Sequence, residues 1–187
     1  MSEENSDRRG QHRRYSDRRA ALLLEIHEII FEHPPGPERD RLVLEAVRRD
    51  FGACRGLLAA PGAGGSGVVV AAACGQWTEE PRGRVLDGPG LLALRETHRL
   101  VPGVVTLTYV RRPPVFPPEH WERLFKADLC EPSSAMLSVE IRPARAPASL
   151  LLLQEAVASR EWSSQDRSMA EEVAHLLSRA ADKDADS

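Results

Sequence analysis

The most reactive side chains of this 187-residue sequence are its three cysteines, Cys54, Cys74 and Cys130. A cysteine attacks a substrate as the thiolate, which requires a nearby base or positive charge that lowers its pKa. Cys54 and Cys74 fall in short apolar segments, and this favours small buried hydrophobes. Cys130 follows a predicted helix with no base beside it. The odd number and wide spacing predict neither a disulfide framework nor a zinc site, so we expect reduced thiols.

Other arrangements that activate a nucleophile or hold a metal are missing from the sequence. It contains no Gly-x-Ser-x-Gly elbow, no phosphate loop ending in Gly-Lys and no His-x-x-x-His pair. The glycine-rich string "PGAGGSG" at 61–67 is not followed by the helix that phosphate binding needs, so it predicts a turn. We therefore expect no catalytic residues and no metal site, and the sequence leaves any cofactor unknown.

Composition excludes some classes of partner. The chain has 25 basic and 28 acidic residues and a net charge of -3, which gives no strong field for nucleic acid or an anionic membrane. No segment approaches the roughly 20 apolar residues needed to span a bilayer, and the start of the chain lacks the apolar core of a secretory signal. We expect a cytoplasmic protein with no membrane or nucleic-acid partner.

The length is enough for one domain with a substantial core. Residues 1–15 mix charges of both signs with almost no apolar side chains, which predicts a disordered, Arg-rich tail or linker. The acidic end at 182–187 is also expected to be disordered. The domain itself is predicted to span residues 16–181.

Hydrophobic periodicity predicts the elements of this domain. Helical spacing places Leu22, Ile26, Ile29 and Ile30 on one face, and Ser163 with Asp166 has the pattern of a capping box. Helices are expected at 16–33, 37–51, 91–100, 118–129 and 163–181, and strands at 54–60, 67–73, 104–110, 136–141 and 149–156.

Hairpin-like strands, with helices gathered at both ends of the chain, predict an α+β fold. We expect a central antiparallel sheet with the terminal helices packed on one face. A pocket is expected on the other face, under the short helices in the middle of the chain.

This order of elements resembles the GAF domain, a small-molecule sensor module of signalling proteins with a PAS-like layout. The resemblance rests on "DFGACRGLLAA", on the strand pair "AMLSVEI" and "SLLLLQEA", and on the closing helix "EWSSQDRSMAEEVAHLLSRAA", and it spans residues 20–181. These motifs are patterned rather than invariant, so the resemblance implies the fold more than the function.

The sequence matches only in part the motifs by which members of this family bind or convert their ligands. The Asn-Lys-Phe-Asp-Glu signature of cyclic-nucleotide binders does not occur. "PEHWERL" at 118–124 is similar to the phytochrome helix, but Glu119 and Trp121 stand where a plant-type chromophore cysteine would flank His120. Members that reduce free methionine sulfoxide use clustered cysteines in mid-domain, which differ from the cysteine positions here.

The resemblance implies a pocket between the sheet and the two mid-chain helices. Arg95 and His98 lie three residues apart on one helix, where Arg95 could pair with a carboxylate or phosphate. The alternative for these two is a solvated helix surface. Trp121 could wall an aromatic ligand, and packing in the core is the alternative. The candidate ligand-binding residues are Arg95, His98, Thr108, Tyr109, His120 and Trp121.

Three functional hypotheses remain open. The first is a non-catalytic regulatory sensor or interaction domain of a cytoplasmic signalling protein, which binds a small molecule and acts on a downstream signalling protein. It would signal through dimerising terminal helices as a homodimer. The second is a thiol-dependent reductase of the free methionine sulfoxide type. The third is a pocketless protein-interaction module whose aromatic residues fill the cavity.

Overall fold

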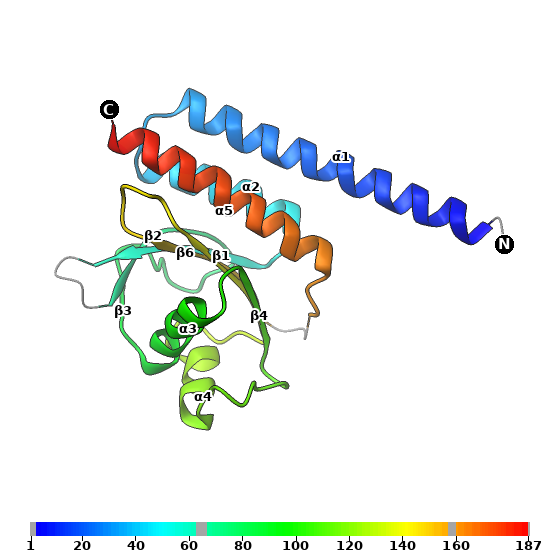
Figure 1. Ribbon diagram of the computed structural model, residues 1–187. Helices are drawn as coiled ribbons and strands as arrows, with labels where there is room; N and C mark the ends of the chain where they lie inside the picture. The colour runs from blue at the N-terminus through cyan, green and yellow to red at the C-terminus, as the bar shows by residue number, and fades with distance from the viewer. Residues whose placement is uncertain (1–2, 63–66, 157–159, 187) are drawn as a thin grey trace.

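The computed structural model describes residues 3–62, 67–156 and 160–186, and within these ranges it contains five helices and one six-stranded sheet (Figure 1). The turn predicted at 61–67 falls mainly on residues 63–66, outside the described residues. The helices are α1 (Glu3–Glu32), α2 (Pro37–Phe51), α3 (Pro89–Leu100), α4 (Pro118–Lys126) and α5 (Ser164–Ala185). The strands are β1 (Arg55–Pro61), β2 (Val68–Gly75), β3 (Val85–Leu86), β4 (Val104–Thr108), β5 (Ala135–Ile141) and β6 (Ser149–Glu155).

The sheet has the strand order β3-β2-β1-β6-β5-β4, and every neighbouring pair is antiparallel. The central strand β6 reads as an unbroken apolar run because it is covered on both faces, as the sequence predicts. Leu151 and Leu153 pack toward the terminal helices, whereas Leu150 and Leu152 pack toward α3 and α4. The α+β fold with a central antiparallel sheet is thus confirmed.

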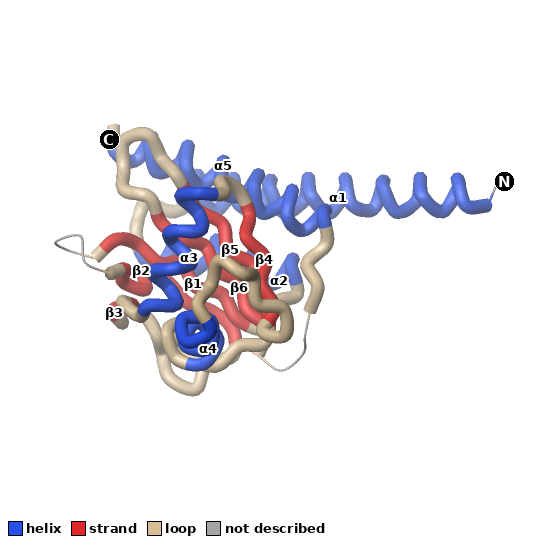
Figure 2. The backbone as a smooth tube through the Cα atoms, turned by 60° about the horizontal axis from the view of Figure 1, so that its bottom comes forward, coloured by secondary structure: helices blue, strands red, loops and turns tan. Residues whose placement is uncertain are grey.

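Helices cover both faces of the sheet, as Figure 2 shows. On one face α2 and α5 contact the strands, and α1 lies over α2 and α5 as an outer layer. On the other face α3 and α4 pack against each other and against the sheet. Each face has its own apolar core, so the sheet separates two independent interiors.

Local signals set the ends of the main helices. Gly52 ends α2 in a left-handed conformation, φ 61°, and its backbone N–H bonds back to the helix. At the start of α5 the Ser163 side chain accepts a hydrogen bond from the backbone N–H of Asp166, and the Asp166 carboxylate accepts one from the Ser163 N–H. This is the predicted capping box.

The two terminal helices are longer than the sequence predicts. Helix α1 begins at Glu3 and α5 continues to Ala185, so residues 3–15 and 182–185 are helical, not the disordered tails that we expected. The low apolar content of residues 1–15 excludes a buried position but not a helix, because no proline interrupts the segment and α1 continues directly from it. The N-terminal half of α1 projects past the rest of the domain (Figure 1).

Candidate functional site

Aromatic side chains fill much of the interior under α3 and α4, where the sequence predicts the pocket. Trp121 is 3% exposed, and its ring centroid lies 5.3 Å from that of Phe116 and 4.8 Å from that of Phe125. Its indole N–H donates to the carbonyl of Tyr109 at 3.0 Å. The structure thus brings Tyr109 and Trp121 together, with Trp121 as a core residue. Its role as a ligand wall stays a prediction.

His98 is fully buried on the same face. Its Nε2 lies 2.8 Å from the hydroxyl of Ser138 on β5. Burial lowers the pKa of His98, and the Glu140 carboxylate opposes this shift. This contact between a neutral imidazole and a hydroxyl links α3 to β5.

The other predicted site residues are more scattered. Arg95 is half-buried on α3, and Thr108 ends β4 at the rim of the sheet. His120 lies on α4, with its side chain 34% exposed and its Nε2 3.9 Å from the Glu119 carboxylate. The structure does not gather all six candidates into one site, and ligand binding by these residues stays a prediction.

A buried polar cluster, which the sequence did not indicate, lies on this same face at the ends of β1 and β6. We define it as Arg55, Ser133 and Gln154. Arg55 is 2% exposed and Gln154 fully buried, and the two are paired across the sheet register. The Arg55 guanidinium contacts Glu131 at 2.6 Å and stacks on Trp77.

Several polar atoms of this cluster have no partner among the described residues. They are the Arg55 Nε, the Ser133 hydroxyl and both amide atoms of Gln154. Buried polar groups are nearly always hydrogen-bonded, and each unpaired one costs about 1–3 kcal/mol. The cluster therefore offers donors and an acceptor to a small polar molecule. In the sequence, the one sign of this cluster is Gln154, a polar residue within the apolar segment "SLLLLQEA".

The cysteines lack the environment of a reactive thiol. Burial raises the pKa of Cys74 to about 12, and the neighbouring Glu45 carboxylate adds to this shift. Burial also raises the pKa of Cys130. Cys54 donates its S–H to the Gln154 carbonyl at 3.0 Å and accepts from the Ala156 N–H.

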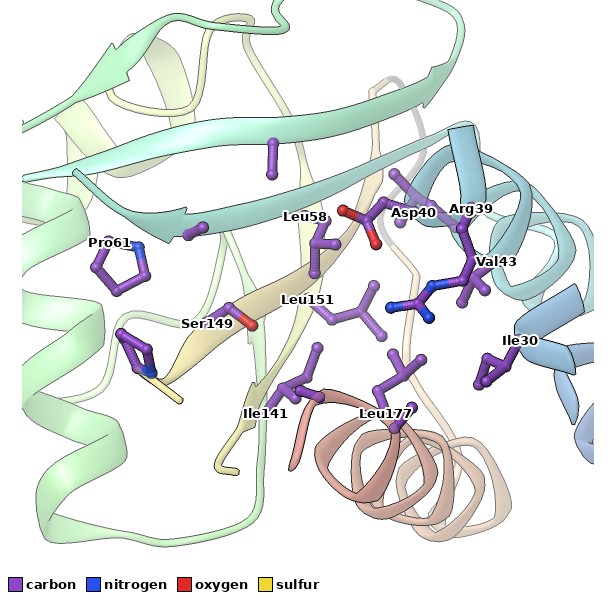
Figure 3. Close-up of a pocket in the computed structure, with 16 residues that line it drawn as sticks. Ile30, Arg39, Asp40, Val43, Leu58, Pro61, Ile141, Ser149, Leu151 and Leu177 are labelled. Carbon is purple, nitrogen blue, oxygen red and sulfur yellow. The ribbon is translucent and has the colours of Figure 1, made fainter. Parts of the chain in front are cut away.

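A cavity of about 310 Å³ lies on the opposite face of the sheet, between α2, α5 and the strands (Figure 3). Its walls are mainly apolar, and the side chains of Arg39 and Asp40 from the first turn of α2 reach toward it. The Arg39 guanidinium makes a two-point contact with the Asp184 carboxylate on α5, including 3.2 Å from Nη1 to Oδ1. None of the six candidate ligand-binding residues lines this cavity.

The described residues contain neither a group suited to a metal ion nor a helix suited to a membrane. Across residues 3–62, 67–156 and 160–186, no group of three or more His, Cys, Asp or Glu side chains is placed to hold a metal ion. In the same ranges no helix is long and apolar enough to cross a membrane.

Solved structures with this architecture are GAF domains and related proteins. The GAF domain of a protein described as a sensor histidine kinase, from Pseudomonas syringae pv. tomato, is 20% identical with a TM-score of 0.60, covering 95% of this chain and 94% of that one. The phycocyanobilin-bound GAF domain of a cyanobacterial phytochrome is 14% identical with a TM-score of 0.73, covering 89% and 94%. The free methionine-R-sulfoxide reductase of Neisseria meningitidis, solved with its substrate, is 14% identical with a TM-score of 0.62, covering 90% of each.

The chain therefore has the fold of a GAF domain, as the sequence resemblance implies. No protein-family profile matches the sequence, and no curated protein matches it. Similarity at this level of identity establishes the fold alone, so the function has to be argued from the residues of this chain.

Proposed function

We propose that this chain is a non-catalytic regulatory domain of a signalling protein. In this proposal the domain recognises a small molecule on the α3/α4 face and transmits its state through α1. The observation that carries it is the unpaired amide of Gln154 beside Arg55, in a buried position of a GAF fold.

The chemistry of the polar cluster supports a small polar ligand. An amide presents a donor pair and an acceptor, and the Arg55 Nε adds a charged donor. A molecule that pairs with these atoms removes their unfavourable burial, so binding would stabilise the folded domain. Among the solved structures of this fold, the cyanobacterial phytochrome domain holds a phycocyanobilin and the Neisseria enzyme its substrate.

The exposed surface of α1 supports the second part of the proposal. Four residues at alternating spacings of four and three form a stripe along the helix, which we call the α1 stripe: Ala20, Leu24, His27 and Phe31. Leu24 is 61% exposed and Phe31 86% exposed. This spacing is that of a coiled-coil seam, so we expect a second copy of α1 to cover the stripe in a homodimer.

The reductase alternative has less support from the site. It needs a thiolate near neutral pH, whereas burial raises the pKa of both Cys74 and Cys130. The fold likeness to the Neisseria reductase keeps this alternative worth testing.

Native mass spectrometry of the protein purified from cells tests ligand recognition. We expect the wild-type chain to carry an additional small-molecule mass, and Gln154→Leu to lose it. Because leucine removes the unpaired amide without leaving a void, the variant should be at least as stable as the wild type. Wild-type protein without any bound small molecule would contradict the proposal and favour the pocketless interaction module, in which the aromatic residues fill this face.

A further inference from the structure

The cavity on the helix face has the composition of a ligand site. Its volume of about 310 Å³ is at the lower end of the roughly 300–1,000 Å³ typical of small-molecule pockets. Most of the wall is aliphatic, contributed by α2, α5 and the strands, and Figure 3 shows Val43, Leu58, Leu151 and Leu177 around it. Such walls accept an apolar body of small size.

The two charged residues at this cavity are not equivalent. Arg39 is already engaged, because its guanidinium pairs at two points with the Asp184 carboxylate. An anionic ligand would have to displace Asp184 from this bidentate pair, which is the strongest type of ion pair in proteins. A ligand carboxylate or phosphate is therefore disfavoured.

Asp40 has the opposite character. Among the residues that the structure describes, none makes a hydrogen bond or an ion pair with the Asp40 carboxylate, and Asp40 lines the same cavity. The guanidinium that lines the cavity, that of Arg39, is already paired with the Asp184 carboxylate outside the lining. The local charge balance therefore lacks one positive charge beside Asp40.

The pKa of the Asp40 carboxyl is consistent with the lack of a cation beside it. Burial raises the pKa of the Asp40 carboxyl, the Arg39 guanidinium lowers it, and the Asp184 carboxylate raises it. The result is a raised pKa, so the charge of Arg39 does not compensate for the burial of this carboxylate. A cation placed beside Asp40 would supply the missing stabilisation.

We propose that this cavity binds a small hydrophobic amine. The ammonium group donates to the Asp40 carboxylate, and the apolar body lies among Val43, Leu58 and Leu151. An ammonium on a hydrophobic stem matches one free carboxylate in an aliphatic wall, whereas a neutral molecule would leave that carboxylate unpaired.

The cavity lies among three helices, so a bound amine would affect how these helices are arranged. The cavity is bordered by Ile30 of α1, by α2 and by Leu177 of α5, so an amine inside it contacts the three helices that carry the outer surface. Binding would therefore favour one arrangement of α1 relative to α5. The amine site itself does not rest on the proposed sensing by the polar cluster, which lies on the other face of the sheet.

Calorimetric titration with three matched probes tests the proposal: 2-phenylethylamine, 2-phenylethanol and 3-phenylpropionate. We expect the amine to bind about tenfold more tightly than the alcohol, because a charge-assisted hydrogen bond replaces a neutral one. The carboxylate should bind most weakly. Asp40→Asn should reduce the amine to the affinity of the alcohol.

Two further variants make the test specific. Asp17→Asn removes the same charge from an exposed position of α1, about 20 Å along the helix from Ile30, and should leave amine binding unchanged. Ala181→Leu fills the cavity from α5 with a good helix former and should abolish binding of all three probes.

Absence of amine binding to the wild type, tighter binding of the carboxylate, or an amine preference that survives in Asp40→Asn would overturn the proposal. If Asp40→Asn does not fold, the proposal is still tested by the order of affinity of the three probes for the wild type and by the loss of binding in Ala181→Leu. Failure here leaves the native mass spectrometry of Gln154→Leu unaffected, so the two proposals fail separately.

Discussion

The imidazole of His98 is buried, with its Nε2 2.8 Å from the Ser138 hydroxyl, and the charged groups of Glu140 and Arg142 act on it from nearby. Because burial lowers its pKa, the folded protein binds fewer protons than the unfolded chain when the pH falls below about 6.5, the ordinary value. His98 therefore contributes to the free energy of unfolding at pH values above the ordinary pKa of histidine. This contribution is lost as the pH falls toward the lower pKa of the folded state.

We therefore expect urea unfolding to show a smaller loss of stability between pH 7.5 and pH 5.5 in His98→Gln than in the wild type. The matched control is His175→Gln, which removes an exposed histidine of α5 and should keep the wild-type pH dependence. An unchanged pH dependence in His98→Gln would show that His98 titrates normally in the folded protein.

Cys74 gives a second prediction at the residue scale. With a pKa of about 12, against an ordinary value of 9.0, it has a thiolate fraction about a thousandfold below that of an unperturbed cysteine. Iodoacetamide at pH 7.5, followed by peptide mass mapping, should label Cys74 only after unfolding in urea. Labelling of Cys74 or Cys130 in the folded protein at the rate of free cysteine would restore the reductase hypothesis.

At the scale of the element, the capping box of α5 should make a measurable contribution to stability. Ser163→Ala removes the side-chain oxygen that accepts from the Asp166 N–H, and this should cost about 1 kcal/mol of unfolding free energy in urea titrations. Ser168→Ala changes the same residue type at an exposed position inside α5 and should stay within about 0.5 kcal/mol of the wild type. Equal effects of the two substitutions would mean that the box contributes nothing.

The regular elements are the part of the structure that the sequence predicts best. Helical spacing in α2 identified Val43, Ala46 and Val47 as a buried face, and all three are at most 5% exposed. The two-residue strand β3 was missed, because it is too short to show an alternating pattern.

The candidate sites were less predictable, for a physical reason. Arg55 and Gln154 are far apart in sequence and meet only through the antiparallel register of β1 and β6. Similarly, the sequence shows Asp40 as a favourable acid in the first turn of a helix, and only the tertiary fold, which brings residues of α5 and the strands near it, shows that Asp40 lines a cavity. Periodicity gives the face of an element but not the partners that the tertiary fold brings to it.

At the scale of the whole molecule, the sheet separates two interiors of different composition. The α3/α4 side holds the polar cluster, and the terminal-helix side holds the cavity beside Asp40. Helix α1 packs on α2 and α5 and borders the cavity through Ile30, so a change on the terminal-helix side can reach α1 directly, whereas a change on the α3/α4 side has to pass through the sheet. We therefore propose that the domain acts through the surface of α1.

Sedimentation equilibrium of the full chain tests this claim most directly. We predict a dimer for the wild type and a monomer for Phe31→Glu, which places a charge on the most exposed apolar residue of the α1 stripe. Leu92→Glu makes the same type of change at a 47% exposed leucine of α3 and should remain dimeric. A monomeric wild type at all concentrations, or a Phe31→Glu variant that still dimerises, would contradict the account.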